Sequence, residues 1–272
     1  MNSVGVPTVT FDLWYTLVFL DPREQDRYMD RQAEIAVRAL QSAEPIPVDG
    51  PERKAGELRA AFLREVARAT DAAADGESVP CSEQFRRAAL SAGRAADPEG
   101  YLTELAKLLA ATPLQPVPGS LECLETLRGA GYRLAVVSNT VGEPGRAFRP
   151  LLQGLGFDPF IETYVFSDEL PWTKPNPEIF RRAMHLIGST AAETVHVGDG
   201  WSDIEGARRA GLRAGILFTG HPPYTSRYRR FTLGRAGEPA RSPLTAARLA
   251  DVPELVRRLL PNGVGSPPSG RT

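Results

Sequence analysis

Carboxylates, a hydroxyl and an amine stand at widely separated points of this chain, and these groups can do chemistry together. Asp12, Ser138 and Asp199 each follow a short run of apolar and β-branched residues. A carboxylate can act as a nucleophile, and several carboxylates together bind hard divalent cations through oxygen. A hydroxyl and an amine, such as those of Ser138 and Lys174, can hold the oxygens of an anionic group. These residue types are typical of group transfer on an anionic substrate.

The elements that must position these residues are strands of a parallel sheet. Strand patterns occur at 8–12, 133–137, 164–166, 194–197 and 213–218, and helical patterns occur at 120–128, 143–153, 177–187 and 202–210. Strands that alternate with helices of this length indicate a parallel sheet with helices on both faces. Because functional groups gather at the carboxyl ends of such strands, we expect Asp12, Ser138 and Asp199 to converge on one crevice.

Between the first two predicted strands the amino-acid composition of the chain changes. Residues 21–111 are rich in Ala, Arg, Glu and Leu, with apolar residues at helical spacing. Turn-forming residues at 44–51, 75–80 and 97–98 divide this region into about four helices, and we expect no strand in it. We predict that this helical block lies over the crevice as a lid.

The predicted fold class is therefore α/β, with a doubly wound, Rossmann-like parallel sheet and an inserted, mostly helical cap domain. The catalytic core is discontinuous in sequence and comprises residues 1–18 and 115–260, with the cap at 19–114. Residues 261–272 are rich in Gly, Pro and Ser and are predicted to form a disordered tail.

Composition excludes several classes of protein. The 272 residues are 42% hydrophobic and 24% charged, which are ordinary globular values, and no uncharged apolar run approaches the ~20 residues needed to cross a bilayer. With 32 basic and 33 acidic residues the formal net charge is -1, so bulk charge favours neither nucleic acid nor an anionic membrane as a partner. We expect a soluble cytoplasmic protein that acts on a small molecule. The oligomeric state is not indicated.

The cysteines and histidines take no part in the predicted chemistry. Cys81 and Cys123 are too few for a disulfide framework and are expected to be buried thiols. His185, His196 and His221 lie far apart in sequence without ligand spacing, so a histidine metal site or a serine–histidine pair has little support.

An arginine-rich segment follows the last predicted strand. Within residues 221–250 six arginines face one glutamate, a local charge of +5, and three aromatic residues are interleaved. A basic stretch that contains aromatics can bind nucleic acid. Because the chain as a whole is nearly neutral, we favour a long loop.

Four motifs carry a family resemblance. They are Phe11–Leu17, Val137–Asn139, Lys174–Phe180, and Val197–Asp199 with Asp203. Each alone is weak evidence, but together and in this order they resemble the haloacid dehalogenase superfamily, a large group of mostly magnesium-dependent phosphatases with an aspartate nucleophile. The helical block matches the position of the cap in one major branch of that family, and the resemblance covers most of residues 8–220.

The resemblance implies a role for each motif residue. Asp12 is the expected nucleophile, which would form an aspartyl-phosphate, and Thr16 would orient its carboxylate. Ser138 and the amide at Asn139 would bind phosphoryl oxygens, and Lys174 would neutralise charge that accumulates during transfer.

A Mg²⁺ site is implied at the same place. Asp12, Asp199 and Asp203 offer hard oxygen ligands, and the family's further protein ligand is the backbone carbonyl at the position of Trp14. Three carboxylates and Lys174 leave a charge of -2, from three negative charges and one positive, which would repel an anionic substrate unless a divalent cation balanced it. Asp203 has a second interpretation, because the dipole of a helix also favours an acidic residue in its first turn.

Trp14 departs from the family pattern. The family's phosphatases usually have a second aspartate there, which protonates the leaving group and later activates water. Indole has no proton that titrates near neutral pH, and loss of a general acid or base typically costs ~10²- to 10⁴-fold in rate. Trp14 and the bulky Tyr15 beside it can stack on a substrate ring, although packing against the cap is favoured.

Three functions stay open. The favoured one is a Mg²⁺-dependent hydrolase of a phosphorylated small metabolite, with a good leaving group or with acid supplied by the cap or the substrate. A 2-haloacid dehalogenase is the second, because halide needs no protonation, although Gly198–Asp199 is atypical of those metal-free enzymes. The third is a catalytically weak member that binds a ligand or a partner. The substrate and its pathway are not indicated.

Overall fold

A parallel β-sheet lies at the centre of the structure, a computed structural model that describes residues 6–46, 54–225 and 244–261. Within those residues the sheet has six strands in the order β10–β9–β8–β1–β6–β7, all parallel to their neighbours. The strands are β1 (Thr8–Phe11), β6 (Arg133–Ser138), β7 (Thr163–Phe166), β8 (Thr194–Gly198), β9 (Ala214–Phe218) and β10 (Leu244–Ala246). This arrangement confirms the predicted α/β class with a doubly wound, Rossmann-like sheet.

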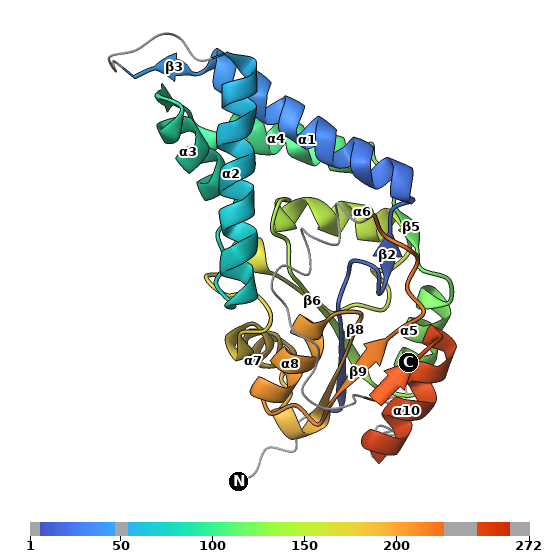
Figure 1. Cartoon of the computed structure of the whole chain (residues 1–272). Coiled ribbons are helices and arrows are strands. Elements are labelled where there is room, and N and C mark those ends of the chain that lie inside the picture. The colour runs from blue at the N-terminus through green and yellow to red at the C-terminus, as the bar shows by residue number, and fades with distance from the viewer. Residues whose placement is uncertain (1–5, 47–53, 226–243, 262–272) are drawn as a thin grey trace, which may run out of the picture.

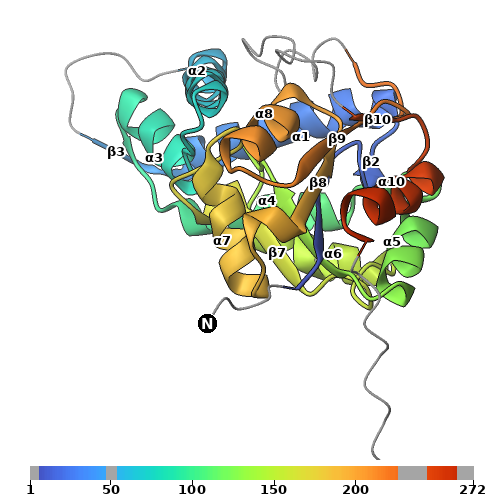
Figure 2. The same cartoon turned by 90° about the horizontal axis from the view of Figure 1, so that it is seen from below.

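The order of the strands places β1 in the middle of the sheet. From β1 the chain crosses to β6 and β7 on one side and then returns to β8, β9 and β10 on the other, which leaves a topological switch point beside β1. Figure 1 shows α7 (Pro177–Ile187) and α8 (Trp201–Arg209) against one face, and α5 (Ser120–Gly129) and α10 (Val252–Leu259) against the other. Figure 2 shows the same layers from below.

Helix α7 shows how local sequence sets the ends of these helices. Asn176 precedes the helix, and its side chain accepts a hydrogen bond from the amide of Glu178, while Pro177 occupies the first turn. At the other end Gly188 has a φ of 70°, a left-handed conformation that glycine adopts without steric cost. The predicted helix at 177–187 is confirmed at both ends.

Apolar residues of the central strands form the core below the site. Val9, Phe11 and Val197 have no exposed surface, as expected for strands that are covered on both faces. Cys81 and Cys123 are also buried and free, which confirms the expectation of buried thiols.

The helical insertion predicted at residues 19–114 lies between β1 and β6 in the chain and above the sheet in Figure 1. Its described part contains α1 (Pro22–Ser42), α2 (Ala55–Ala74), α3 (Cys81–Ser91) and α4 (Pro98–Ala110), so the four predicted helices are confirmed. The rings of Phe85 and Tyr101 stack 4.3 Å apart in its core. Across the described ranges, no helix is long and apolar enough to span a membrane.

Short antiparallel strand pairs occur where none was predicted. β2 (Val18–Phe19) pairs with β5 (Gln115–Pro116) where the chain enters and leaves the insertion. Within the insertion β3 (Glu44–Pro45) pairs with β4 (Arg94–Ala95), so the expectation of no strand over residues 21–111 is wrong. Two residues are too few to show the alternation that identifies a strand.

The helix expected at 143–153 begins later than predicted. A 3₁₀ turn at Gly145–Ala147 precedes α6 (Phe148–Gly154). A Cβ added to Gly145 would lie 2.5 Å from the Cβ of Phe166, so the chain is held tightly against β7 before the helix can start. Other 3₁₀ turns lie at Ser167–Glu169, Ala191–Glu193 and Leu249–Asp251.

The chain beyond β9 adds a strand and a helix that the sequence did not reveal. The expectation of one long loop over 221–250 is wrong at its end, because β10 pairs with β9 and places Ala246 opposite Phe218. Of its three residues only Ala246 is buried, so no alternating pattern marked it. Residues 226–243, with five of the six arginines, and 262–272, most of the predicted tail, lie outside the described residues.

Candidate active site

The carboxyl ends of β1 and β8 bring two predicted carboxylates together. Phe11 pairs with Val136 on one side and with Val197 on the other, so the three central strands end at a similar level. Asp12 follows β1 directly, and Asp199 follows β8. The predicted convergence at the switch point is present in the structure.

An acidic cluster forms where these strands end. Asp12, Asp199 and Asp203 each offer a carboxylate oxygen, and these atoms lie within 4.8 Å of one another. Burial raises the pKa of Asp12 to about 6, with Lys174 opposing the rise and Asp203 adding to it. Burial and the negative charges of Asp12 and Asp203 raise the pKa of Asp199 well above its usual range. A nearby positive charge would therefore stabilise the ionised form of these carboxylates.

Lys174 supplies one such positive charge. Its side chain is 2% exposed, and its ammonium group donates hydrogen bonds to Asp12 and, over 2.6 Å, to Oδ1 of Asp203. Burial lowers the pKa of Lys174, but the two carboxylates raise it by more, so the net shift is upward. The ammonium is therefore charged at neutral pH and joins the third motif to the first and fourth.

Asp203 is held from both ends of its carboxylate. Its Oδ1 lies 3.0 Å from Nε2 of His196, and its Oδ2 accepts a hydrogen bond of 2.9 Å from the amide of Gly200 at the start of α8. A Cβ on Gly198 would lie 2.2 Å from Cγ of Asp203, so only glycine permits this approach. Burial raises the pKa of Asp203, but Lys174 and His196 outweigh it and hold the pKa well below its usual range. Asp203 thus interacts with the N-terminus of α8, as its second interpretation requires. The role of Asp203 as a metal ligand stays a prediction.

His196 belongs to the site, although no role was predicted for it. Its Nδ1 lies 2.9 Å from Oγ1 of Thr10, and its Nε2 contacts Asp203, so both ring nitrogens have partners. Burial lowers the pKa of His196, which keeps the ring neutral at pH 7. The available signal was a histidine inside a buried apolar strand, because such a ring needs polar partners on neighbouring elements.

Two predicted hydroxyls lie buried without a partner. Among the described residues, neither Ser138 Oγ nor Thr16 Oγ1 makes a hydrogen bond. The structure therefore does not bring the Thr16 hydroxyl into a hydrogen bond with Asp12. A buried hydroxyl without a partner is costly, and a bound anionic group would supply an acceptor.

Asn139 connects the second and third motifs. Its Nδ2 donates to the carbonyl of Lys174 over 3.0 Å, and its Oδ1 accepts from the amide of Lys174 over 2.8 Å. This pair of bonds fixes the backbone from which the Lys174 side chain extends. The side chain of Asn139 is thus engaged within the protein, and its backbone amide stays the predicted substrate contact.

Trp14 and Tyr15 pack inside the protein. Tyr15 has a φ of 61°, a left-handed conformation in the loop after Asp12, and its ring lies 5.0 Å from that of Tyr224. The ring of Trp14 meets Phe148 edge-on at 5.7 Å and lines a small cavity beside α1. The ring contact with Phe148 lies within the core, so packing of Trp14 against the cap stays a prediction.

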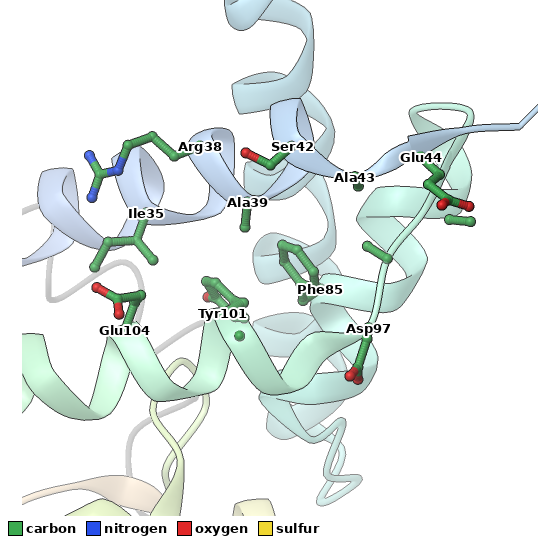
Figure 3. Close-up of a pocket in the computed structure, with 13 residues that line it drawn as sticks. Ile35, Arg38, Ala39, Ser42, Ala43, Glu44, Phe85, Asp97, Tyr101 and Glu104 are labelled. Carbon is green, nitrogen blue, oxygen red and sulfur yellow. The ribbon is translucent and has the colours of Figure 1, made fainter.

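A wider groove of about 500 Å³ lies in the insertion between α1 and α4. Figure 3 shows Ile35 and Ala39 from α1 facing Tyr101 and Glu104 from α4. None of the carboxylates of the cluster lines it. The candidate active site is therefore the edge of the sheet and not this groove.

Comparison with known sequences identifies the family. A family model of haloacid dehalogenase-like hydrolases matches residues 6–211. The chain is 29% identical to the phosphoglycolate phosphatase of Caulobacter vibrioides over 222 residues, which covers 81% of this chain and 83% of that protein. It is 33% identical to the pyrophosphatase PpaX of Halalkalibacterium halodurans over 104 residues, which covers 38% of this chain. That match spans 47% of the relative, so the chain covers about half of its length.

Solved structures share the fold over nearly the whole chain. A HAD phosphatase from Thermococcus onnurineus is similar with a TM-score of 0.58 and 21% identity, over 92% of this chain and 98% of that one. A 2-haloacid dehalogenase from Pseudomonas syringae is similar with a TM-score of 0.58 and 24% identity, over 93% and 99%. At these identities the likeness shows the fold alone. Since the family model covers most of the chain, this protein belongs to the haloacid dehalogenase-like hydrolases.

Proposed function

We propose that this hydrolase is a Mg²⁺-dependent phosphatase that acts on a phosphorylated small molecule through an aspartyl-phosphate at Asp12. The observation that carries the proposal is the buried cluster in which Lys174 lies against Asp12 and Asp203. Such a cluster with one ammonium group can accept a divalent cation and an anionic substrate together. The phosphatase name of the relative from Caulobacter vibrioides, which matches over most of its length, supports the same activity.

The donor set of the cluster fits Mg²⁺. Asp12, Asp199 and Asp203 offer carboxylate oxygens within 4.8 Å of one another, and Mg²⁺ prefers hard oxygen ligands. These carboxylates, with the backbone carbonyl of Trp14, would hold the ion. When bound, Mg²⁺ would offset the negative charge of the carboxylates and of the phosphoryl group.

The residues of the chain carry the chemistry in two stages. A carboxylate oxygen of Asp12 forms a bond to phosphorus, and the bond to the leaving oxygen breaks with its electron pair on that oxygen. Water then attacks phosphorus, the bond between phosphorus and the Asp12 oxygen breaks, and dihydrogen phosphate, which keeps both protons of the water, leaves behind the free carboxylate. Lys174 and the unpartnered hydroxyl of Ser138 hold the phosphoryl oxygens in both stages.

Trp14 restricts the leaving group. Its indole supplies no proton to the departing oxygen, so leaving groups that are stable as anions react best. Acyl, enol and aryl phosphates have such leaving groups, whereas alkyl phosphates do not. We therefore propose a substrate with an activated phosphoryl group, or one with its own proton source.

The helical insertion acts as the cap of the site. The core then comprises residues 1–18 and 115–260, and the cap comprises residues 19–114. Its contacts with the core support this role. Ser78 donates a hydrogen bond to the carbonyl of Ser167 over 2.6 Å, and Gln84 donates to the carbonyl of Val141. Both core residues lie in loops at the carboxyl ends of strands.

Phosphate release from acyl and aryl phosphates with and without Mg²⁺ tests the proposal. We expect release only with Mg²⁺, and its loss in Asp12→Asn. A dehalogenase is the second candidate because Trp14 suits a leaving group that needs no proton. Halide release from a 2-haloacid that persists in a chelator would select it, and turnover of neither class would select a binding role.

A further inference from the structure

A small, partly open cavity lies between two core loops and α1, and one of these loops carries Asp12. Trp14 contributes one wall from the loop after β1, and Glu143 contributes another from the loop after β6. Leu20 and one face of α1 complete the lining, with Gln25, Tyr28, Met29 and Gln32. The cavity has room for about one water-sized group.

Glu143 places an unbalanced acidic group in this cavity. It is 8% exposed, and among the described residues no Lys, Arg or His forms an ion pair with it. Burial raises the pKa of Glu143 to about 7, the charge of Asp168 adds to the rise, and hydrogen bonds from Gly142 and Gln32 limit it. A buried carboxylate without a cation is costly, so the cavity favours a positively charged occupant.

The remaining lining suits a small cation. Trp14 and Tyr28 contribute aromatic rings, which attract cations through their faces. Gln32 donates from Nε2 to the carbonyl of Gly142 over 3.2 Å, which leaves its amide oxygen as an acceptor. A primary ammonium group is about as large as a water molecule and donates three hydrogen bonds, so its size and donors match this lining.

The cavity adjoins the loop that carries Asp12, because Trp14 of that loop lines it. Trp14 is two residues after Asp12, and two residues of backbone span at most about 7 Å. Glu143 is five residues after Ser138 on the loop of the second motif. A short molecule can thus place its phosphoryl group at Asp12 and its other end in the cavity.

We propose that this cavity binds a primary ammonium group of the substrate, so that the substrate is a small amine that carries an activated phosphoryl group. The inference rests on the proposed phosphatase function and adds the substrate class. A quaternary ammonium is too large for the space, and Glu143 repels a substrate that carries a carboxylate at this position.

Isothermal titration calorimetry with matched phosphonates tests this inference without turnover. 2-Aminoethylphosphonate and propylphosphonate have the same chain length and differ in one terminal group, ammonium or methyl. With Mg²⁺ present, we expect the wild-type protein to bind the amine at least about tenfold more tightly. Because neither compound is hydrolysed, loss of the proposed phosphatase activity would leave this affinity ratio measurable.

Glu143→Gln identifies the group responsible, because it removes the charge and keeps the shape. We expect this variant to lose the preference for the amine while its affinity for propylphosphonate is retained. Glu99→Gln removes an exposed carboxylate of α4 that pairs with Arg146, and it should keep the wild-type ratio. Tyr28→Phe removes one oxygen of the lining and should reduce the preference in part.

Equal affinity of the wild-type protein for the two phosphonates would overturn the inference. The inference would also fail if Glu143→Gln weakened the binding of both phosphonates equally, because a structural role of Glu143 would affect both affinities alike. If Glu143→Gln does not fold, the wild-type ratio and the effect of Tyr28→Phe decide.

Discussion

The ammonium nitrogen of Lys174 lies 2.6 Å from Oδ1 of Asp203 and also contacts Asp12. One cation thus serves two carboxylates that come from different ends of the sequence. Asn139 holds the backbone of Lys174, so the second motif determines where this cation sits. The four motifs form one connected network at the edge of the sheet.

Replacement of Lys174 by Met should destabilise the fold and abolish phosphate release. The substitution keeps most of the side chain but leaves buried carboxylates without their cation, which typically costs about 3 to 5 kcal/mol. We expect this loss in urea unfolding at neutral pH. The loss should shrink as the pH falls toward about 6, because without Lys174 the pKa of Asp12 rises above its wild-type value of about 6 and the carboxyl of the variant becomes neutral.

Lys107→Met is the matched control for this prediction. Lys107 pairs with Glu104 on the exposed surface of α4, where an ion pair contributes little to stability. An equally small effect of both substitutions would show that the buried network does not stabilise the protein.

Trp14→Asp should change the leaving-group preference. The new carboxylate can protonate a departing alkoxide, a contribution of roughly 10²- to 10⁴-fold in general acid catalysis. We therefore expect kcat/KM for an alkyl phosphate to rise relative to that for an aryl phosphate. The variant also loses the edge contact between Trp14 and Phe148, so its unfolding must be measured alongside. An unchanged ratio in a folded variant would mean that protonation does not limit the reaction.

Glu143 should make the stability of the free protein fall as pH rises. Burial raises the pKa of Glu143 from 4.5 to about 7, so the folded protein holds this proton more tightly than the unfolded chain. The stabilisation is complete below about pH 4.5 and is lost as pH rises through about 7. A shift of this size corresponds to about 3 kcal/mol.

The Glu143→Gln variant lacks this titration and is the reference. Urea unfolding of both proteins from about pH 4.5 to about pH 8 should show the wild type losing stability relative to the variant. Parallel pH profiles would contradict the raised pKa of Glu143.

Strand ends made most of the site predictable from the sequence. Asp12, Ser138 and Asp199 each follow an apolar run, and in a parallel sheet such positions meet at one edge. The pairing of Phe11 with Val136 and Val197 brings this about in the structure. Convergence depended on the order and type of the elements, which regular patterns reveal well.

Contacts between side chains were not predictable in the same way. His196 received no role because its partners, Thr10 and Asp203, are distant or lie on another element. The hydrogen bonds of Asn139 with Lys174 depend on how two loops meet. Strands as short as β10 stayed hidden, because three residues with one buried position carry no period.

The most direct measurement is mass spectrometry of the peptide that contains Asp12 after rapid quenching during turnover of an aryl or acyl phosphate. Borohydride reduces an aspartyl-phosphate to homoserine and leaves a free aspartate unchanged. Because Trp14 cannot activate water, the intermediate should accumulate, and we expect homoserine at position 12 only when Mg²⁺ is present. Turnover in which Asp12 stays unmodified at every quench time would contradict a covalent role for this carboxylate.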